Sequence, residues 1–209
     1  DRQTAKRIRE TGFSYVGVSL DGLAGTNDRF RGQAGAFDAA LAGMRHCTEA
    51  GVRVGLRLTL NRHNLADLDA IFDLLEEEGI RRACFYHLVY AGRGKRIQGD
   101  DLSLAETRAA VERIFERTED LHARGVGIEV LTVDNHADGP YLLRRVQEHQ
   151  PSRVVGVQQL LRWNGGNSSG IGIGAVDHLG QVHADQFWQH YSFGNVRQRP
   201  FSEIWLDTS

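Results

Sequence analysis

The sequence predicts an α/β fold, with a parallel sheet and its helices in residues 1–133 and an irregular α+β C-terminal subdomain in residues 134–209. The first observation is that strand-like apolar runs alternate with amphipathic helical patterns every ~30–40 residues, as in βαβ units. The second is that this alternation stops after Val133, where a polar loop, short helices and a hairpin pattern follow. Right-handed crossovers make the successive strands parallel. Four such strands are compatible with a barrel and with an open sheet.

The first strand, residues 15–20, organises the rest of the chain. It shows little polar alternation, which predicts a parallel strand covered on both faces. It ends in Ser19-Leu-Asp-Gly22, which places polar groups and a flexible turn at its carboxyl end. Ligands of α/β proteins bind at that end of the strands. On the residues alone, an ordinary strand-to-loop turn is a slightly better interpretation.

The elements that follow are each predicted by a local pattern. A first helix ends at Gly12, and residues 22–35 are expected to form a glycine-rich loop. Apolar residues at helical spacing predict a helix over residues 36–50. Asn64 is expected to cap the next helix, which ends at Gly79. The further strands are expected at residues 52–60, 83–90 and 127–133.

A capping box, Ser103-Leu-Ala-Glu106, opens a long helix that ends at Gly125. In the C-terminal part, helices are expected over residues 141–149 and 151–163, a hairpin over residues 171–184 and a helical turn over residues 201–205.

Composition excludes several classes of protein. The 209 residues are 41% hydrophobic and 25% charged, with a net charge of −2, so no overall field favours nucleic acid or a membrane surface. No apolar run is long enough to span a membrane. Two cysteines, Cys47 and Cys84, lie in apolar patterns, which indicates a reducing, cytoplasmic compartment and no metal site made by cysteines alone. The chain begins as if within a helix and without Met, so we expect a piece of a longer protein.

Polar side chains gather at the carboxyl ends of the predicted strands. If the strands are parallel, these groups converge on one edge of the sheet. Serine and aspartate suit ribose hydroxyls or an amino group, and the planar fork of Arg57 suits a carboxylate. An internal salt bridge is an equally good interpretation of Arg57. The candidate ligand-binding residues are Ser19, Asp21, Arg57, Asn61, His87 and Arg93.

Two further segments could carry chemistry. Gly92-Arg-Gly-Lys95 offers backbone donors and cations for a carboxylate or phosphate, although a solvated turn is the better explanation of this segment taken alone. Histidines and aromatic residues cluster late in the chain, where they could ligate a metal or stack on a flat macrocycle, and no spacing matches a zinc site. The best candidate among them is His183 with Asp185.

Several stretches resemble a known family. Val16-Gly-Val-Ser-Leu-Asp-Gly22, Asp28-Arg-Phe-Arg-Gly32 and Ala36-Phe37 resemble the middle of radical S-adenosylmethionine (SAM) enzymes. Gly180-Gln-Val-His, Gly194-Asn-Val and Ser202-Glu-Ile-Trp205 resemble the C-terminal extension of the SPASM and twitch branch. The more particular stretches are similar to the NirJ-like proteins of haem d1 biosynthesis: His87-Leu-Val-Tyr-Ala-Gly-Arg-Gly94, Asn135-His-Ala-Asp-Gly-Pro-Tyr-Leu142 and His183-Ala-Asp-Gln-Phe-Trp-Gln-His-Tyr191.

The resemblance implies a partial (β/α)6 barrel, with SAM across the strand tips beside a 4Fe-4S cluster. It implies SAM cleavage to a 5′-deoxyadenosyl radical, an electron donor such as flavodoxin or ferredoxin, and removal of propionate side chains from a didecarboxylated sirohaem. By position, it assigns SAM binding to Ser19, Asp21, Arg57, Asn61 and His87. The implied substrate residues are Arg93, His136, Asp138, His183 and Asp185.

The chain departs from the family pattern because the CxxxCxxC loop that binds the cluster is absent, as are cysteines for an auxiliary cluster. We therefore expect the chain alone to bind no cluster and to cleave no SAM. Because half a barrel exposes strand edges and the apolar face of its sheet, we also expect the chain alone to be marginally soluble. Two other functions stay open: a radical SAM maturase of peptides, and a non-catalytic tetrapyrrole-binding module.

Overall fold

The computed structural model describes residues 1–207, except for the side chain of Arg93. It divides into two compact units, residues 1–135 and the residues from 136 on. Within the described residues, no helix is long and apolar enough to cross a membrane.

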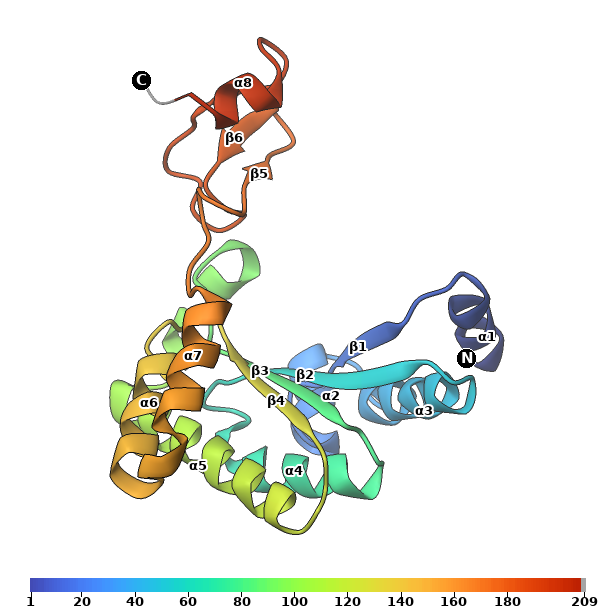
Figure 1. The fold of residues 1–209 in the computed structure, drawn as a ribbon. Helices are drawn as coiled ribbons and strands as arrows, with labels where there is room; N and C mark the ends of the chain where they lie inside the picture. Colours follow the sequence, from blue (N-terminus) through green and yellow to red (C-terminus); the bar gives the residue numbers. More distant parts are fainter. Residues whose placement is uncertain (208–209) are drawn as a thin grey trace. The chain divides into compact units, whose positions relative to one another are not determined.

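The first unit is built on a parallel sheet (Figure 1). Its strands are β1 (Tyr15–Ser19), β2 (Arg53–Thr59), β3 (Arg82–Tyr86) and β4 (Glu129–Val133), in the order β1-β2-β3-β4. The predicted parallel order is therefore confirmed, and the register places Gly17 opposite Gly55 and Ser19 opposite Arg57. The third strand is shorter than expected, since residues 87–90 leave the sheet.

Helices of the first unit follow the predicted apolar spacing. In α3 (Ala36–Glu49), the residues Phe37, Leu41, Met44 and Cys47 are buried because they recur on one side of the helix. The capping box of α5 (Leu104–Ala123) is confirmed, with Ser103 and Glu106 each bonding the other's backbone. Further helices are α1 (Arg2–Glu10), α4 (Leu68–Glu77) and the 3-10 segments η1 (Leu65–Asp67) and η2 (Gly92–Asp100).

Two local predictions were wrong. Residues 22–35 are not a loop throughout, because α2 (Ala24–Arg31) forms there and ends at Gly32, whose φ of 66° suits glycine. Asn64 does not cap the following helix, since η1 intervenes and the Asn64 side chain bonds to the backbone of other loops instead.

The sheet has one covered face and one open face, which corrects the expectation that its first strand is covered on both. Leu56, Leu58 and Phe85 point toward the helices and are almost completely buried. Their neighbours in sequence point the other way, and there Arg53 and Arg57 are exposed while Tyr15 is only partly buried. The apparent apolar run of β1 misleads because Gly17 has no side chain that would reveal the alternation.

The second unit combines a helical pair with a small antiparallel sheet of order β5-β6-β7. The expected hairpin is confirmed as β5 and β6, although its first strand is shorter than predicted, and the third strand β7 was not anticipated. Val182 and Ile204 are the most buried apolar residues of the second unit. The elements are α6 (Asp138–His149), η3 (Pro151–Arg153), α7 (Val154–Asn164), β5 (Ala175–Val176), β6 (Gln181–His183), β7 (Gly194–Asn195) and α8 (Phe201–Trp205).

Candidate functional site

The open face of the sheet is shaped by two glycines in one register pair, Gly17 and Gly55. A Cβ at Gly17 would overlap the Nε and Cζ atoms of Arg57, and a Cβ at Gly55 would overlap the ring and hydroxyl of Tyr15. The missing side chains therefore let Arg57 and Tyr15 lie flat across neighbouring strands. The result is a polar face where an α/β protein usually carries apolar residues.

Arg57 lies across Gly17 near the carboxyl end of β2 and is exposed. Among residues 1–207, no carboxylate forms an ion pair with it, so the salt-bridge interpretation finds no partner in the described structure. Tyr86 lies on the same face; burial raises the pKa of its hydroxyl, and the charge of Arg57 opposes that rise. The Arg57 fork is thus available to two oxygens of a carboxylate.

Ser19 and Asp21 form the tip of β1 and are held by α2. The Nε of Arg31 donates to Oδ2 of Asp21 at 2.5 Å, and its Nη2 donates to the Ser19 carbonyl at 3.2 Å. The backbone N–H of Asp21 donates to Oδ1 of Asn27 at 2.9 Å. The Asp21 carboxylate is therefore engaged within the protein, whereas the Ser19 residue is exposed.

Asn61 is buried and shapes the turn after β2. Its Nδ2 donates to the Thr59 carbonyl at 3.0 Å, and its Oδ1 accepts from the His63 N–H at 2.9 Å. Sequence reasoning missed the partner of this turn, Asn64, whose Nδ2 donates to the carbonyls of Thr59 at 2.8 Å and Asp21 at 3.2 Å. Asn64 therefore ties the two strand tips together, a role that only the register of β1 and β2 reveals.

The β3 tip is less closely tied to these groups. His87 is half-buried directly after β3, and its N–H donates to the Val133 carbonyl at 2.9 Å. Arg93 belongs to η2, and its side chain lies outside the described part of the structure. Lys95 and Arg96 of the same segment are exposed.

In the second unit, His183 and Asp185 hold a loop of residues 185–193, here called the aromatic loop. His183 is 5% exposed, and its Nδ1 lies 2.7 Å from the Tyr191 carbonyl while its Nε2 lies 3.5 Å from Oδ2 of Asp177. Oδ1 of Asp185 accepts from the N–H groups of Phe187 and Trp188, both at 2.7 Å. A side-chain hydrogen bond from Ser169 and these backbone bonds lower the pKa of Asp185.

The aromatic loop presents a connected set of rings. The Trp188 and Tyr191 ring centroids are 6.3 Å apart, and those of Tyr191 and Phe193 are 5.3 Å apart. All three side chains, with Phe187, are 41–57% exposed. Such a surface suits a flat apolar ligand. The other substrate candidates of this unit lie at the start of α6, where His136 is exposed and Asp138 is buried.

The described residues do not fit an iron–sulfur cluster. Cys47 and Cys84 are both buried, and they lie on different elements. Within residues 1–207, no group of three or more His, Cys, Asp or Glu side chains is placed to hold a metal ion.

Two curated proteins are similar to this chain over nearly its whole length. No protein-family model matches the chain. Fe-coproporphyrin III synthase of Methanosarcina barkeri is 63% identical over 209 residues, which cover 100% of this chain and 52% of that protein. Pre-heme d1 synthase of Dinoroseobacter shibae is 42% identical over 203 residues, which cover 96% of this chain and 50% of that protein. The chain thus spans about half the length of the curated relatives it matches.

A solved structure shares the fold. Streptococcus suis SuiB bound to S-adenosylmethionine matches with a TM-score of 0.68 at 14% identity, over 100% of this chain and 45% of that one. At this identity the likeness shows the fold alone, which is part of a radical SAM fold. By sequence the chain is therefore a relative of Fe-coproporphyrin III synthase and pre-heme d1 synthase, and its fold is part of the radical SAM fold that its resemblance predicted.

Proposed function

We propose that this chain supplies the SAM-binding face of a radical SAM enzyme that modifies an iron tetrapyrrole. The observation that carries the proposal is Arg57, which lies across Gly17 on the open face and has no carboxylate partner among residues 1–207. An unpaired guanidinium at the carboxyl end of a parallel strand suits the carboxylate of a bound amino-acid moiety.

The proposed roles follow from the contacts of each side chain. Arg57 binds the methionine carboxylate of SAM with its fork, and the exposed Ser19 hydroxyl binds a ribose hydroxyl. Asp21 and Asn61 keep the strand tips in shape, because their polar atoms already bond to Arg31 and to the turn after β2. His87 faces the adenine or the substrate. When SAM is bound, it supplies the group that abstracts a hydrogen atom from the substrate. The residues named here orient SAM.

We place the cluster ligands outside residues 1–207, and we assign the reductant to a separate protein. Because the described residues fit no cluster, we assign no cluster ligand to them. We propose a flavodoxin or ferredoxin as the electron donor. We further propose that residues 1–133 are the later strands of a partial barrel and residues 134–209 are an incomplete SPASM/twitch-like extension.

The substrate proposed is an iron tetrapyrrole, since the relatives at 63% and 42% identity are named for Fe-coproporphyrin III and pre-heme d1. The aromatic loop offers exposed rings that can contact the macrocycle, and His183 and Asp185 hold that loop in place. Arg93, His136 and Asp138 are proposed as further substrate contacts. Removal of propionate side chains from didecarboxysirohaem is one proposed reaction, and the higher identity to the first relative favours Fe-coproporphyrin III as the product.

Binding of SAM tests the role of Arg57. We expect Arg57→Gln in the intact protein to raise the Kd for SAM by ~10–100-fold, since a charge-assisted hydrogen bond contributes ~1.5–3 kcal/mol. Arg57→Lys, which keeps the charge and loses the fork, should weaken binding to an intermediate degree. Calorimetric titration is the measurement, and Arg2→Gln on the exposed side of α1 is the matched control. Equal affinity in all four proteins would refute the proposed site.

Product analysis separates the candidate reactions. The intact protein, SAM and a chemical reductant are incubated with didecarboxysirohaem, and the tetrapyrrole is analysed by mass spectrometry. A tetrapyrrole that has changed in mass but keeps its propionates supports Fe-coproporphyrin III formation. A product that has lost propionates supports the haem d1 route. Modification of a peptide with no change to the tetrapyrrole would instead support a peptide maturase, and binding of the tetrapyrrole without turnover would support a carrier.

A further inference from the structure

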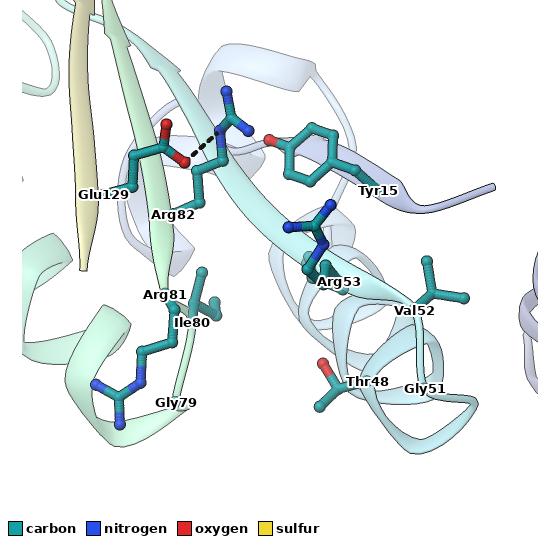
Figure 2. A pocket seen from close by; sticks show the side chains of 11 residues that line it. Tyr15, Thr48, Gly51, Val52, Arg53, Gly79, Ile80, Arg81, Arg82 and Glu129 are labelled. Atoms are coloured by element: carbon teal, nitrogen blue, oxygen red, sulfur yellow. Dashed lines mark ion pairs between the residues drawn. The ribbon is translucent and has the colours of Figure 1, made fainter. Parts of the chain in front are cut away.

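A hollow of about 360 Å³ opens at the amino-terminal ends of the strands, remote from the proposed SAM site (Figure 2). It lies on the same open face of the sheet, but Arg53 precedes Arg57 by four residues, a separation of ~13 Å along a strand. Four of its lining side chains stand at the starts of the four strands: Tyr15, Arg53, Arg82 and Glu129.

Tyr15 lines this hollow and has an unpaired hydroxyl group within the described structure. Its hydroxyl oxygen is shielded from solvent and has no hydrogen-bond partner among the described residues. A buried hydroxyl without a partner costs free energy, so native structures usually provide one. The ring is fixed in this position because it lies against Gly55, where no side chain competes for space.

Two guanidinium groups flank Tyr15 (Figure 2). The Cζ of Arg82 lies 4.9 Å from the centre of the Tyr15 ring, and its Nε lies 3.3 Å from Oε2 of Glu129. Arg53 donates its Nε to the Ser14 carbonyl at 3.2 Å, and its terminal nitrogens bond no other described residue.

The charge in the hollow is unbalanced. Glu129 is the only acidic side chain that lines it among the described residues, and it pairs with Arg82. Arg81 points away from Tyr15 (Figure 2). The inner wall therefore has an excess of positive charge and a hydroxyl donor that lacks an acceptor.

We propose that this hollow binds a carboxylate, which accepts from the Arg53 fork, from Arg82 and from the Tyr15 hydroxyl. Arginine forks bind two carboxylate oxygens at once, and a tyrosine hydroxyl supplies a third donor. The carboxylate belongs either to a free small acid or to an aspartate or glutamate side chain of the protein outside these 209 residues. This site is independent of the proposed SAM site, because it uses none of the same side chains.

Titration with succinate tests the proposal in the intact protein. If the carboxylate is that of a free acid, we expect succinate to raise the melting temperature of the intact protein in a saturable manner. Arg53→Gln and Arg82→Gln should each weaken the affinity by ~10–100-fold, and Tyr15→Phe, which removes only the hydroxyl, by ~2–10-fold. Arg81→Gln is the matched control, and its affinity should be unchanged.

The two sources of the carboxylate give different results in the intact protein. If the acid is free, succinate binds the intact protein and the same variants weaken that binding. If the carboxylate is internal, the intact protein does not bind succinate, and Arg53→Gln, Arg82→Gln and Tyr15→Phe each lower its melting temperature while Arg81→Gln does not. The proposal is wrong if the intact protein shows no saturable response to succinate and the three variants lower its melting temperature no more than Arg81→Gln does, or if Arg81→Gln weakens binding as much as the other variants.

Discussion

At the scale of single residues, close approach of side chains to glycine builds the open face of the sheet. Gly17 and Gly55 are paired in register, and each is overlain by a long side chain from the neighbouring strand. Neither glycine has a positive φ, so backbone freedom does not explain them. They are required because any Cβ would displace Arg57 or Tyr15.

Gly17→Ala is expected to displace Arg57 while the fold is kept. The new methyl group overlaps the Nε of Arg57, which must rotate away from the face on which we propose that SAM binds. We expect the Kd for SAM in the intact protein to rise by ~10-fold or more, which corresponds to the loss of one charge-assisted hydrogen bond. Calorimetry measures the affinity, and circular dichroism checks the fold.

The matched control is Gly43→Ala in α3, where a Cβ would meet no atom within 4 Å. Alanine favours a helix over glycine by roughly 0.5–1 kcal/mol, so this variant should be slightly more stable and bind SAM normally. Unchanged SAM affinity in Gly17→Ala would contradict the role given to Arg57.

Asp28 is a second residue whose effect can be predicted, because its carboxylate joins the end of α2 to the start of α3. It accepts from the N–H groups of Gly35 at 2.5 Å and Phe37 at 2.8 Å, and these bonds lower its pKa below 3.8. A lowered pKa stabilises the fold above the unfolded pKa, and this stability is lost as pH falls through the folded pKa.

Asp28→Asn should therefore destabilise the chain at pH 7 and have little effect at a pH below the folded pKa of Asp28. Chemical unfolding at several pH values between 7 and 2 is the measurement. Glu10→Gln serves as the control, since Glu10 has only an exposed ion pair with Lys6. Equal destabilisation by Asp28→Asn at both ends of this range would show that the charge of Asp28 is irrelevant.

At the scale of elements, the aromatic loop is organised by polar residues that were first expected to contact substrate. His183 engages the Tyr191 carbonyl and Asp177, and Asp185 caps the N–H groups of Phe187 and Trp188. These contacts explain how four aromatic side chains stay exposed together on a loop without regular secondary structure.

Asp185→Ala should loosen this loop, because two backbone donors lose their acceptor. We expect hydrogen exchange at the Phe187 and Trp188 amides to quicken by ~10-fold, since a hydrogen bond to a charged group contributes ~1.5–3 kcal/mol. The affinity of the intact protein for Fe-coproporphyrin III, followed by absorbance, should fall in parallel.

Asp185→Asn is the informative control, since its amide oxygen can still accept both bonds and should preserve most of the affinity. If Asp185→Ala quickens exchange and leaves the tetrapyrrole affinity unchanged, the aromatic loop does not carry the macrocycle.

At the scale of the whole molecule, stability of the first unit depends on the core between the sheet and its helices. Phe72 of α4 and Phe85 of β3 are fully buried, and their rings stack with centroids 5.3 Å apart. Arg117 of α5 lies over the Phe72 ring at 5.6 Å and also pairs with Asp73. The Phe72 side chain of α4 therefore contacts both β3 and α5.

Phe72→Ala should lower the free energy of unfolding by ~3–5 kcal/mol, because it removes a buried ring and leaves a cavity. Urea unfolding followed by circular dichroism is the measurement. Phe30→Ala is the control, since Phe30 is 38% exposed and its loss should cost much less. Similar effects of the two substitutions would contradict the assigned core.

Much of this organisation follows from local patterns in the chain. Apolar spacing predicts α3, α4 and α5, the capping box marks the start of α5, and the alternation of strands with helices predicts the parallel sheet. Such features depend on neighbours in sequence, so one sequence reveals them. The α2 helix was missed because its residues carry no strong apolar stripe, and only Asn27 among them is buried.

The sequence by itself determined α3, α4 and α5, the parallel strands of the first unit and the polar strand tips that carry Ser19, Asp21 and Arg57. Only the tertiary structure decided which face of the sheet is open, that Asn64 joins two tips, that His183 and Asp185 hold a loop, and that Arg53, Arg82 and Tyr15 share a hollow. The physical reason is that these features depend on strand register and on contacts between distant residues. Register places Gly17 beside Arg57, and no local pattern in either strand specifies that pair.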